Sequence, residues 1–205
     1  MFSENAARVA VFISGSGSNL QALIDGTKAG ILSAKIVLVV SSRRDAYGLE
    51  RAAKENIDTF VFKAKKYATP EEAGEALLDK LAEHKVEYIA LAGYLKLLPA
   101  ELVKTYRNRI VNIHPALLPK YGGKGMYGHF VHEAVIANGD KESGVSVHLV
   151  DEIYDHGKVL EQVRVPVMPD DSPDDLAARV LKQEHKLYAR VLEKLIKGKY
   201  HITNE

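Results

Sequence analysis

An amide, an imidazole and a proline follow one another closely in residues 109–123, and the first two can do chemistry. Residues 110–113 form a short apolar run that predicts a strand. Because side chains alternate between the two faces of a strand, Asn112 and His114 should point the same way. Pro115 has no backbone donor and restricts the residue before it, so regular pairing should end at His114. The sequence therefore predicts an amide beside an imidazole at the carboxyl end of a strand, where open α/β sheets bind ligands.

This pair of side chains suits the stabilisation of charge and the movement of protons. An amide N–H and a protonated imidazole can both donate to a developing oxyanion, and a histidine that titrates near pH ~6.5 can shuttle a proton. A plainer interpretation, in which Asn112 and His114 are strand-end polar groups bonded to the backbone, stays open. The chain has no cysteine, which excludes disulfides, thiolate catalysis and thiolate metal sites.

The beginning of the chain predicts a phosphate site. Residues 8–13 are a continuous apolar run typical of a strand buried on both faces, and a loop rich in glycine and serine follows at once. Apolar residues at helical spacing come next, with Ser18 or Asn19 expected to cap the helix. Strand, glycine-rich loop and helix aim backbone N–H groups and a helix dipole at a phosphate.

The glycine-rich loop fits neither of the two common nucleotide fingerprints. The dinucleotide pattern requires a third glycine where Leu20 stands, and no Gly-Lys-Ser/Thr sequence is present. A mononucleotide or phospho-sugar site is compatible with Gly15 and Gly17, and so is a glycine turn without a ligand. Arg43 and Arg44, after the second predicted strand, raise the alternative of an NADP-binding reductase, or they form a solvated turn.

The remaining patterns set the fold class. We predict an α/β, Rossmann-like, mostly parallel sheet with helices on both faces, extended by an antiparallel C-terminal hairpin. Further strands are expected at residues 35–40, 59–62 and 87–91, helices at 47–56, 69–84, 99–106 and from 171 onward, and the hairpin strands at 143–150 and 159–167.

Length and composition favour one domain, residues 1–205, with a phosphate-binding half to about residue 108 and a catalytic half after it. The chain has 205 residues, is 46% hydrophobic and carries a net charge of +1, so no strong field recruits nucleic acid or membrane. No apolar run approaches the ~20 residues of a membrane helix, and residues 1–5 do not resemble a leader. We expect a cytoplasmic monomer or homodimer that acts on small molecules.

Residues 112–121, Asn-Ile-His-Pro-Ala-Leu-Leu-Pro-Lys-Tyr, resemble the signature of the folate-dependent formyltransferases. The likeness is greatest to the branch that formylates glycinamide ribonucleotide (GAR), and it extends over nearly the whole chain. It implies that 10-formyltetrahydrofolate is the co-substrate, that GAR is the acceptor in purine synthesis, and that no metal takes part. His114 with one acid would in any case offer too few ligands for zinc.

The resemblance also implies roles for particular residues. It places an essential aspartate at Asp155, in the expected hairpin tip, which by composition alone is an ordinary polar tip. If hydrogen-bonded to His114, Asp155 would favour the imidazolium form and fix the ring. The implied catalytic residues are Asn112, His114 and Asp155; those for GAR are Gly17, Ser18, Asn19, Leu20 and Glu184; those for folate are Leu95, Lys96, Leu97, Leu98, Asn112 and Asp151.

Several points stay open on sequence alone. The leucines of residues 95–98 also fit core packing, and Glu184 also fits a solvated helix flank. His129, His132 and His148 are candidates to assist catalysis. The family's folate-tail arginine is missing, and only Lys65 and Lys66 lie near its place. Competing interpretations are a related deformylase, a formyltransferase acting on methionyl-tRNA and a non-catalytic nucleotide-binding module; the first two of these proteins carry additional domains.

Overall fold

The computed structural model describes residues 6–202, so the expectation about a leader in residues 1–5 lies outside the described part. In that part, seven strands form one sheet in the order β3-β2-β1-β4-β5-β6-β7. The pairs from β3 to β5 are parallel, whereas β6 and β7 join antiparallel. The predicted fold class is confirmed. The strands are β1 (Arg8–Ile13), β2 (Lys35–Ser41), β3 (Asp58–Val61), β4 (Tyr88–Leu91), β5 (Ile110–His114), β6 (Glu142–Leu149) and β7 (Val159–Pro166).

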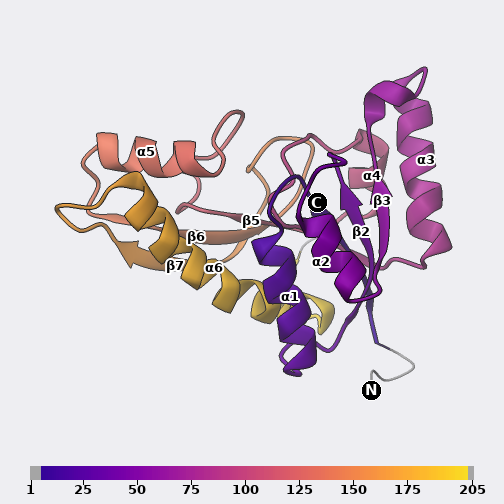
Figure 1. The fold of residues 1–205 in the computed structure, drawn as a ribbon, viewed down its shortest axis with the longest axis horizontal. Coiled ribbons are helices and arrows are strands. Elements are labelled where there is room, and N and C mark those ends of the chain that lie inside the picture. Colours follow the sequence, from indigo (N-terminus) through magenta and orange to yellow (C-terminus); the bar gives the residue numbers. More distant parts are fainter. Residues whose placement is uncertain (1–5, 203–205) are drawn as a thin grey trace.

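Helices cover both faces of this sheet (Figure 1). Side chains of α1, α5 and α6 pack into one core cluster, and those of α3 and α4 pack into the other. The helix α6 runs along the sheet and contacts both α5 and α1. The helices are α1 (Ser18–Lys28), α2 (Gly48–Lys54), the 3₁₀ turn η1 (Ala64–Lys66), α3 (Pro70–Glu83), α4 (Ala100–Thr105), α5 (His129–Ala137) and α6 (Pro173–Ile196).

The central strand β1 shows why an unbroken apolar run is needed. Val9, Val11 and Ile13 belong to the core cluster under α1 and α6, while Ala10 and Phe12 belong to the cluster under α3 and α4. A strand covered on both faces has to be apolar at every position, because each residue meets one core or the other. The glycine-rich loop therefore leaves β1 in the middle of the sheet.

The expected cap of α1 is wrong. Gly17 is the N-cap residue, with φ 70°, and no side chain caps the helix; Ser18 and Asn19 already lie in its first turn. A β-carbon on Gly17 would approach the α-carbon of Gly48 to 2.6 Å, so the loop passes too close to α2 for a larger residue. The later helices begin with side-chain caps, since Thr69 caps α3 and Ser172 forms a capping box on α6.

Candidate active site

The carboxyl ends of β4 and β5 open into a cleft of about 640 Å³. One wall is the first turn of α1 with the facing part of α6, and another is the segment 93–98 after β4. The β6–β7 hairpin and the loop that leads into α5 close the other sides. The site therefore lies at the sheet edge that the sequence predicts.

Four side chains meet at the bottom of this cleft, and we call them the acid–histidine cluster: Asn112, His114, His148 and Asp155. Asn112 and His148 are directly opposite each other in the β5–β6 register, and Asn112 Nδ2 lies 3.0 Å from His148 Nε2. The same Nδ2 donates to Asp155 Oδ1 at 3.2 Å. His148 Nδ1 lies 2.8 Å from the carbonyl of Leu149, so Nδ1 carries the proton and Nε2 can accept from Asn112.

Asp155 reaches the cluster because the β6–β7 connection folds back over the cleft. Its backbone is left-handed, with φ 53°, a conformation that aspartate adopts more readily than most residues. Gly157 follows, and a β-carbon there would collide with the carbonyl oxygen of Leu149. Asp155 Oδ2 accepts the N–H of Gly123 at 3.0 Å, and its side chain is 9% exposed. The hairpin thus presents a buried carboxylate to β5.

The contact between Asp155 and His114 differs from the expected hydrogen bond. Asp155 Oδ2 lies 3.6 Å from His114 Nδ1, which is beyond hydrogen-bond distance. His114 Nε2 lies 2.7 Å from the carbonyl of Tyr121, and a carbonyl only accepts, so Nε2 carries a proton. In the neutral ring the lone pair of Nδ1 therefore faces the carboxylate. A proton taken up by His114 would sit on Nδ1, between the two groups.

Burial and charge act on these two pKa values in opposite directions. Burial lowers the pKa of His114 below 6.5 and outweighs Asp155 and the Tyr121 carbonyl, which raise it. Asp155 thus favours the imidazolium form, but in the free protein the desolvation of the ring has the larger effect on this pKa. Burial alone would raise the pKa of Asp155, but the neighbouring imidazoles of His148 and His114 and the Gly123 N–H keep that pKa below 3.8. The cluster holds an ionised carboxylate between two imidazoles.

At the other end of the cleft lies the first turn of α1. Ser18 and Asn19 line the cleft beside Gly17, whereas the side chain of Leu20 is fully buried in the core, so only its main chain is available to a ligand. Asn19 Nδ2 donates to Glu184 Oε2 at 2.7 Å, and Asn19 Oδ1 is buried without a partner.

The neighbouring glutamate is not on a solvated flank. Glu184 is 6% exposed, lines the cleft, and burial raises its pKa although Asn19 opposes the shift. Together with the unpartnered oxygen of Asn19, it presents buried acceptor atoms to whatever enters this end of the cleft. Such atoms are stabilised by a ligand that brings N–H donors.

The residues expected to hold folate divide into two groups. Leu95, Lys96 and Leu97 are exposed at the mouth of the cleft, while Leu98 is 6% exposed and packs in a core cluster. Asp151 also lines the cleft, and its carboxylate accepts from His156 Nδ1 and the N–H of Ile153. Five exposed large side chains surround the mouth, and we call them the apolar rim: Leu95, Leu97, Tyr127, Ile153 and Tyr154.

The structure separates the three candidate histidines. His148 belongs to the cluster, and sequence reasoning misses this because local patterns do not identify the partner strand of β5. His132, on α5, lines the cleft; it is 4% exposed, and burial lowers its pKa to about 4. His129 lies at the edge of the cleft with a half-exposed side chain, and it pairs with Glu133 and Asp174.

The basic residues singled out in the sequence lie elsewhere. Lys65 and Lys66 are exposed in η1 and are not among the residues that line the cleft. Arg43 pairs with Asp45 in an exposed turn after β2, and Arg44 is exposed beside it. This arrangement fits the solvated turn, which is one of the two interpretations that the sequence leaves open.

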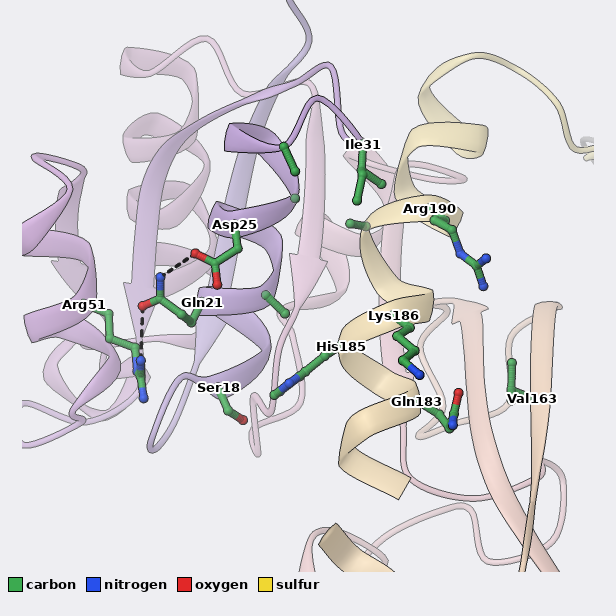
Figure 2. Close-up of a pocket in the computed structure, with 14 residues that line it drawn as sticks. Ser18, Gln21, Asp25, Ile31, Arg51, Val163, Gln183, His185, Lys186 and Arg190 are labelled. Carbon is green, nitrogen blue, oxygen red and sulfur yellow. Dashed lines mark hydrogen bonds between the residues drawn. The ribbon is translucent and has the colours of Figure 1, made fainter. Parts of the chain in front are cut away.

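A second groove, also of about 640 Å³, lies between α1 and α6 (Figure 2). Ser18 lines both depressions, but none of the acid–histidine cluster lines this one. Arg51 donates to Gln21, which donates to Asp25, and His185 extends from α6 toward Ser18. The groove thus combines these polar side chains with apolar ones such as Ile31 and Val163, and it meets the cleft at Ser18.

Two kinds of feature are absent from the described residues. No helix among residues 6–202 is long and apolar enough to cross a membrane. Over the same residues, no group of three or more His, Asp or Glu side chains is placed to hold a metal ion.

The comparisons of this sequence with a family model and with known proteins both identify formyl transferases. The family model described as formyl transferase matches residues 7–192. Phosphoribosylglycinamide formyltransferase from Arabidopsis thaliana, named chloroplastic, is 45% identical over 90% of this chain and 64% of its own length. The enzyme of that name from Haemophilus influenzae is 39% identical over 96% of this chain and 91% of its own.

Solved structures resemble the fold closely. Glycinamide ribonucleotide transformylase 1 from Symbiobacterium toebii superimposes with a TM-score of 0.90 at 34% identity, over 98% of this chain and 93% of its own. A formyltetrahydrofolate deformylase from Pseudomonas syringae has a TM-score of 0.85 at 22% identity, a likeness of fold alone. The chain spans 64% and 60% of the two plant relatives and 15% of a trifunctional purine biosynthetic protein from Drosophila melanogaster.

Proposed function

Because the chain belongs to the formyl transferase family, whose model matches residues 7–192, we propose that it transfers a formyl group from 10-formyltetrahydrofolate to the amino group of 5′-phosphoribosylglycinamide. Relatives that carry the name of this activity are 39–45% identical to the chain. The observation that carries the proposal is the buried Asp155 carboxylate, held against Asn112 and His114 between a helix N-terminus and an apolar rim.

The acceptor end of the cleft suits a phosphorylated glycinamide. The first turn of α1 offers backbone N–H groups that no side chain caps, and such groups bind phosphate. Deeper in, Asn19 Oδ1 and the carboxylate of Glu184 are buried acceptors. An amide or amino group of the acceptor would supply the N–H donors that these oxygens lack. We assign Gly17, Ser18, Asn19, the main chain of Leu20 and Glu184 to this substrate.

The donor end suits a flat, partly apolar ring system. The apolar rim offers large side chains that are 38–60% exposed, and two of them, Leu95 and Leu97, belong to the segment 94–98. Burying them under a ligand releases hydration free energy of roughly 25 cal/mol per Å². We assign Leu95, Lys96, Leu97 and Asp151 to the formyl donor. Leu98 also lines the cleft, and its side chain packs mainly in the core behind this wall.

The chemistry needs one bond made, one broken and one proton moved. A bond forms between the acceptor nitrogen and the formyl carbon, the bond from that carbon to the donor nitrogen breaks, and a proton passes from the acceptor nitrogen to the donor nitrogen. Negative charge develops on the formyl oxygen, and Asn112 Nδ2 and protonated His114 are the donors at hand. In the free protein Asn112 Nδ2 is engaged by His148 and Asp155, so substrate binding has to redirect one of its N–H groups.

Asp155 supplies the negative charge that makes the proton movement favourable. As an ionised carboxylate 3.6 Å from His114 Nδ1, it stabilises the ring while the ring carries a proton. His148 holds Asp155 and Asn112 in register and does not need to touch the substrates. No metal has a step in this scheme.

The test is a formyl-transfer assay with both substrates. We expect formylated GAR and tetrahydrofolate in equal amounts, and no formate when GAR is left out. Formate release without GAR would instead support a deformylase, and binding of NADPH with no transfer would support a reductase. We further propose a monomer or homodimer in the cytoplasm, which size-exclusion chromatography and cell fractionation would check; the plant relative is named chloroplastic.

A further inference from the structure

Ser14 is a buried hydroxyl behind the wall of the cleft, bonded to the cleft-lining segment 94–98, and none of the assigned roles uses it. It directly follows β1, the middle strand of the parallel part of the sheet, and is 4% exposed. Its Oγ accepts the backbone N–H of Leu95 at 2.9 Å and forms a hydrogen bond with the hydroxyl of Ser42 at 2.7 Å. One hydroxyl thus joins the carboxyl ends of β1, β2 and β4.

The bond to Leu95 has no substitute in its own segment. Residues 94–98 form neither helix nor strand, and they line the donor end of the cleft. Within the described chain, 6–202, the hydrogen bond to Ser14 is the one that the main chain of residues 94–98 makes. Without it, packing alone would fix the segment.

In the chain, Ser14 is followed directly by the rest of the glycine-rich loop, which begins at Gly15. The carbonyl of Gly15 accepts the N–H of Gly48 at 3.1 Å, and the carbonyl of Ser16 accepts Arg51 Nε at 2.9 Å. These bonds fasten the loop to α2, so it cannot shift freely. Ser14 therefore ties the loose donor segment to a loop that is already held in place.

We propose that Ser14 is a positioning residue that sets the donor-binding segment 94–98 against the glycine-rich loop that follows β1. This inference rests on the proposed function, since it assigns the two sides of the cleft to donor and acceptor. Ser14 touches no reacting atom. Loss of its hydroxyl frees the segment and leaves the N–H of Leu95 without a partner, which raises the KM for the formyl donor.

The kinetic experiment compares Ser14→Ala with Ser14→Cys and Ser42→Ala. We expect Ser14→Ala to raise the KM for 10-formyltetrahydrofolate about tenfold, as loss of one hydrogen bond predicts, while kcat and the KM for GAR change less than about threefold. Ser14→Cys keeps a weak acceptor of similar size and should recover part of the loss. Ser42→Ala leaves the bond to Leu95 in place and should change the donor KM less than about twofold.

Calorimetry with tetrahydrofolate provides a readout that a merely structural role would not move. Ser14→Ala should bind tetrahydrofolate about tenfold more weakly than the wild type, while its affinity for GAR stays within about threefold. An unchanged donor KM in Ser14→Ala, or equal rises in both KM values with a lower Tm, would overturn the inference. If the wild type transfers no formyl group to GAR, the proposed function fails instead, and tetrahydrofolate binding to Ser14→Ala and Ser14→Cys still decides the role of Ser14.

Discussion

The acid–histidine cluster and the apolar rim share one cleft but are built in opposite ways. In the cluster, His114, His148 and Asp155 have side chains at most 9% exposed, and each makes a hydrogen bond. In the rim, the side chains are 38–60% exposed. Two of them belong to the segment 94–98, whose main chain is held by the hydrogen bond from Leu95 N–H to Ser14. The groups that handle charge are therefore positioned before any ligand arrives, whereas the rim is completed by the ligand.

This difference follows from what each region has to do. Electrostatic stabilisation is effective when donors and charges are fixed in advance in a dry site, because no reorganisation is then needed during the reaction. Recognition of a large ring system draws instead on apolar surface that stays in water until the ligand covers it. We expect mutations in the cluster to act on turnover and mutations in the rim to act on affinity.

The largest effect should come from His114→Asn in the cluster. The amide keeps polarity but cannot take up a proton between Asp155 and the substrates, so kcat should fall roughly 10²- to 10³-fold. Steady-state kinetics with GAR and 10-formyltetrahydrofolate measures it, with His201→Asn, an exposed histidine that does not line the cleft, as the control. A fall in kcat of less than about threefold would remove His114 from the chemistry.

The second effect concerns the pH dependence of stability near the cluster. The pKa of His132 is lowered from 6.5 to about 4, so below pH 6.5 the unfolded chain binds a proton that the folded chain does not. Above pH 6.5 His132 does not change the free energy of unfolding, and as pH falls from 6.5 toward 4 it lowers that free energy. Between pH 7 and pH 5 the loss should be about 2 kcal/mol from this residue alone.

Urea unfolding of the wild type and His132→Gln at pH 7 and pH 5 checks this contribution. The variant should lose about 2 kcal/mol less than the wild type over that interval. His201→Gln, at an exposed histidine that is not among the charges acting on His132, serves as the control. Equal pH dependence in the wild type and His132→Gln would contradict a depressed pKa at this site.

A smaller effect on stability tests the hydrogen bonds between α6 and the strands β4 and β5, the second of which carries Asn112 and His114. Tyr188, fully buried on α6, donates to the carbonyl of Leu91 at 2.8 Å and also lies 3.2 Å from that of Val111, next to Asn112. Tyr188→Phe should lower the free energy of unfolding by about 1 kcal/mol. Thermal denaturation of Tyr188→Phe measures this loss, and Tyr127→Phe, which removes an exposed hydroxyl, is the control. No change in Tm would mean that this bond contributes nothing to the β4–β5 pair.

The smallest effect belongs to the rim. Leu97→Ala removes half-exposed apolar surface, so the KM for the donor should rise about three- to fivefold, less than 1 kcal/mol, with kcat unchanged. Ile31→Ala is the matched control, because Ile31 is similarly exposed but lies in the groove between α1 and α6. If Leu97→Ala lowered kcat instead of donor affinity, the division between the two regions would be wrong.

The sequence predicts the strands and the edge where the ligands bind, because buried strands and capped helices carry local patterns. The apolar run of β1 and the Thr69 and Ser172 caps are examples. The cap of α1 escapes such patterns because Gly17 is needed for a close approach to Gly48, a contact between segments far apart along the chain.

The site is predictable only where local spacing determines it. Alternation along one strand places Asn112 beside His114, but the partner of Asn112 across the sheet, His148, depends on the register of β6. The depressed pKa of His114 likewise depends on burial by the whole fold. Asp155 is found through the family resemblance, since a polar hairpin tip does not reveal which way it folds.

The central claim is that the Asp155 carboxylate drives proton movement in the chemical step without contributing much to binding. The measurement that tests it most directly is the single-turnover rate of Asp155→Asn with GAR and 10-formyltetrahydrofolate both saturating, alongside calorimetric affinities for each. We expect the rate to fall at least about 100-fold while both affinities stay within about threefold of the wild type. A single-turnover rate close to that of the wild type would contradict the account.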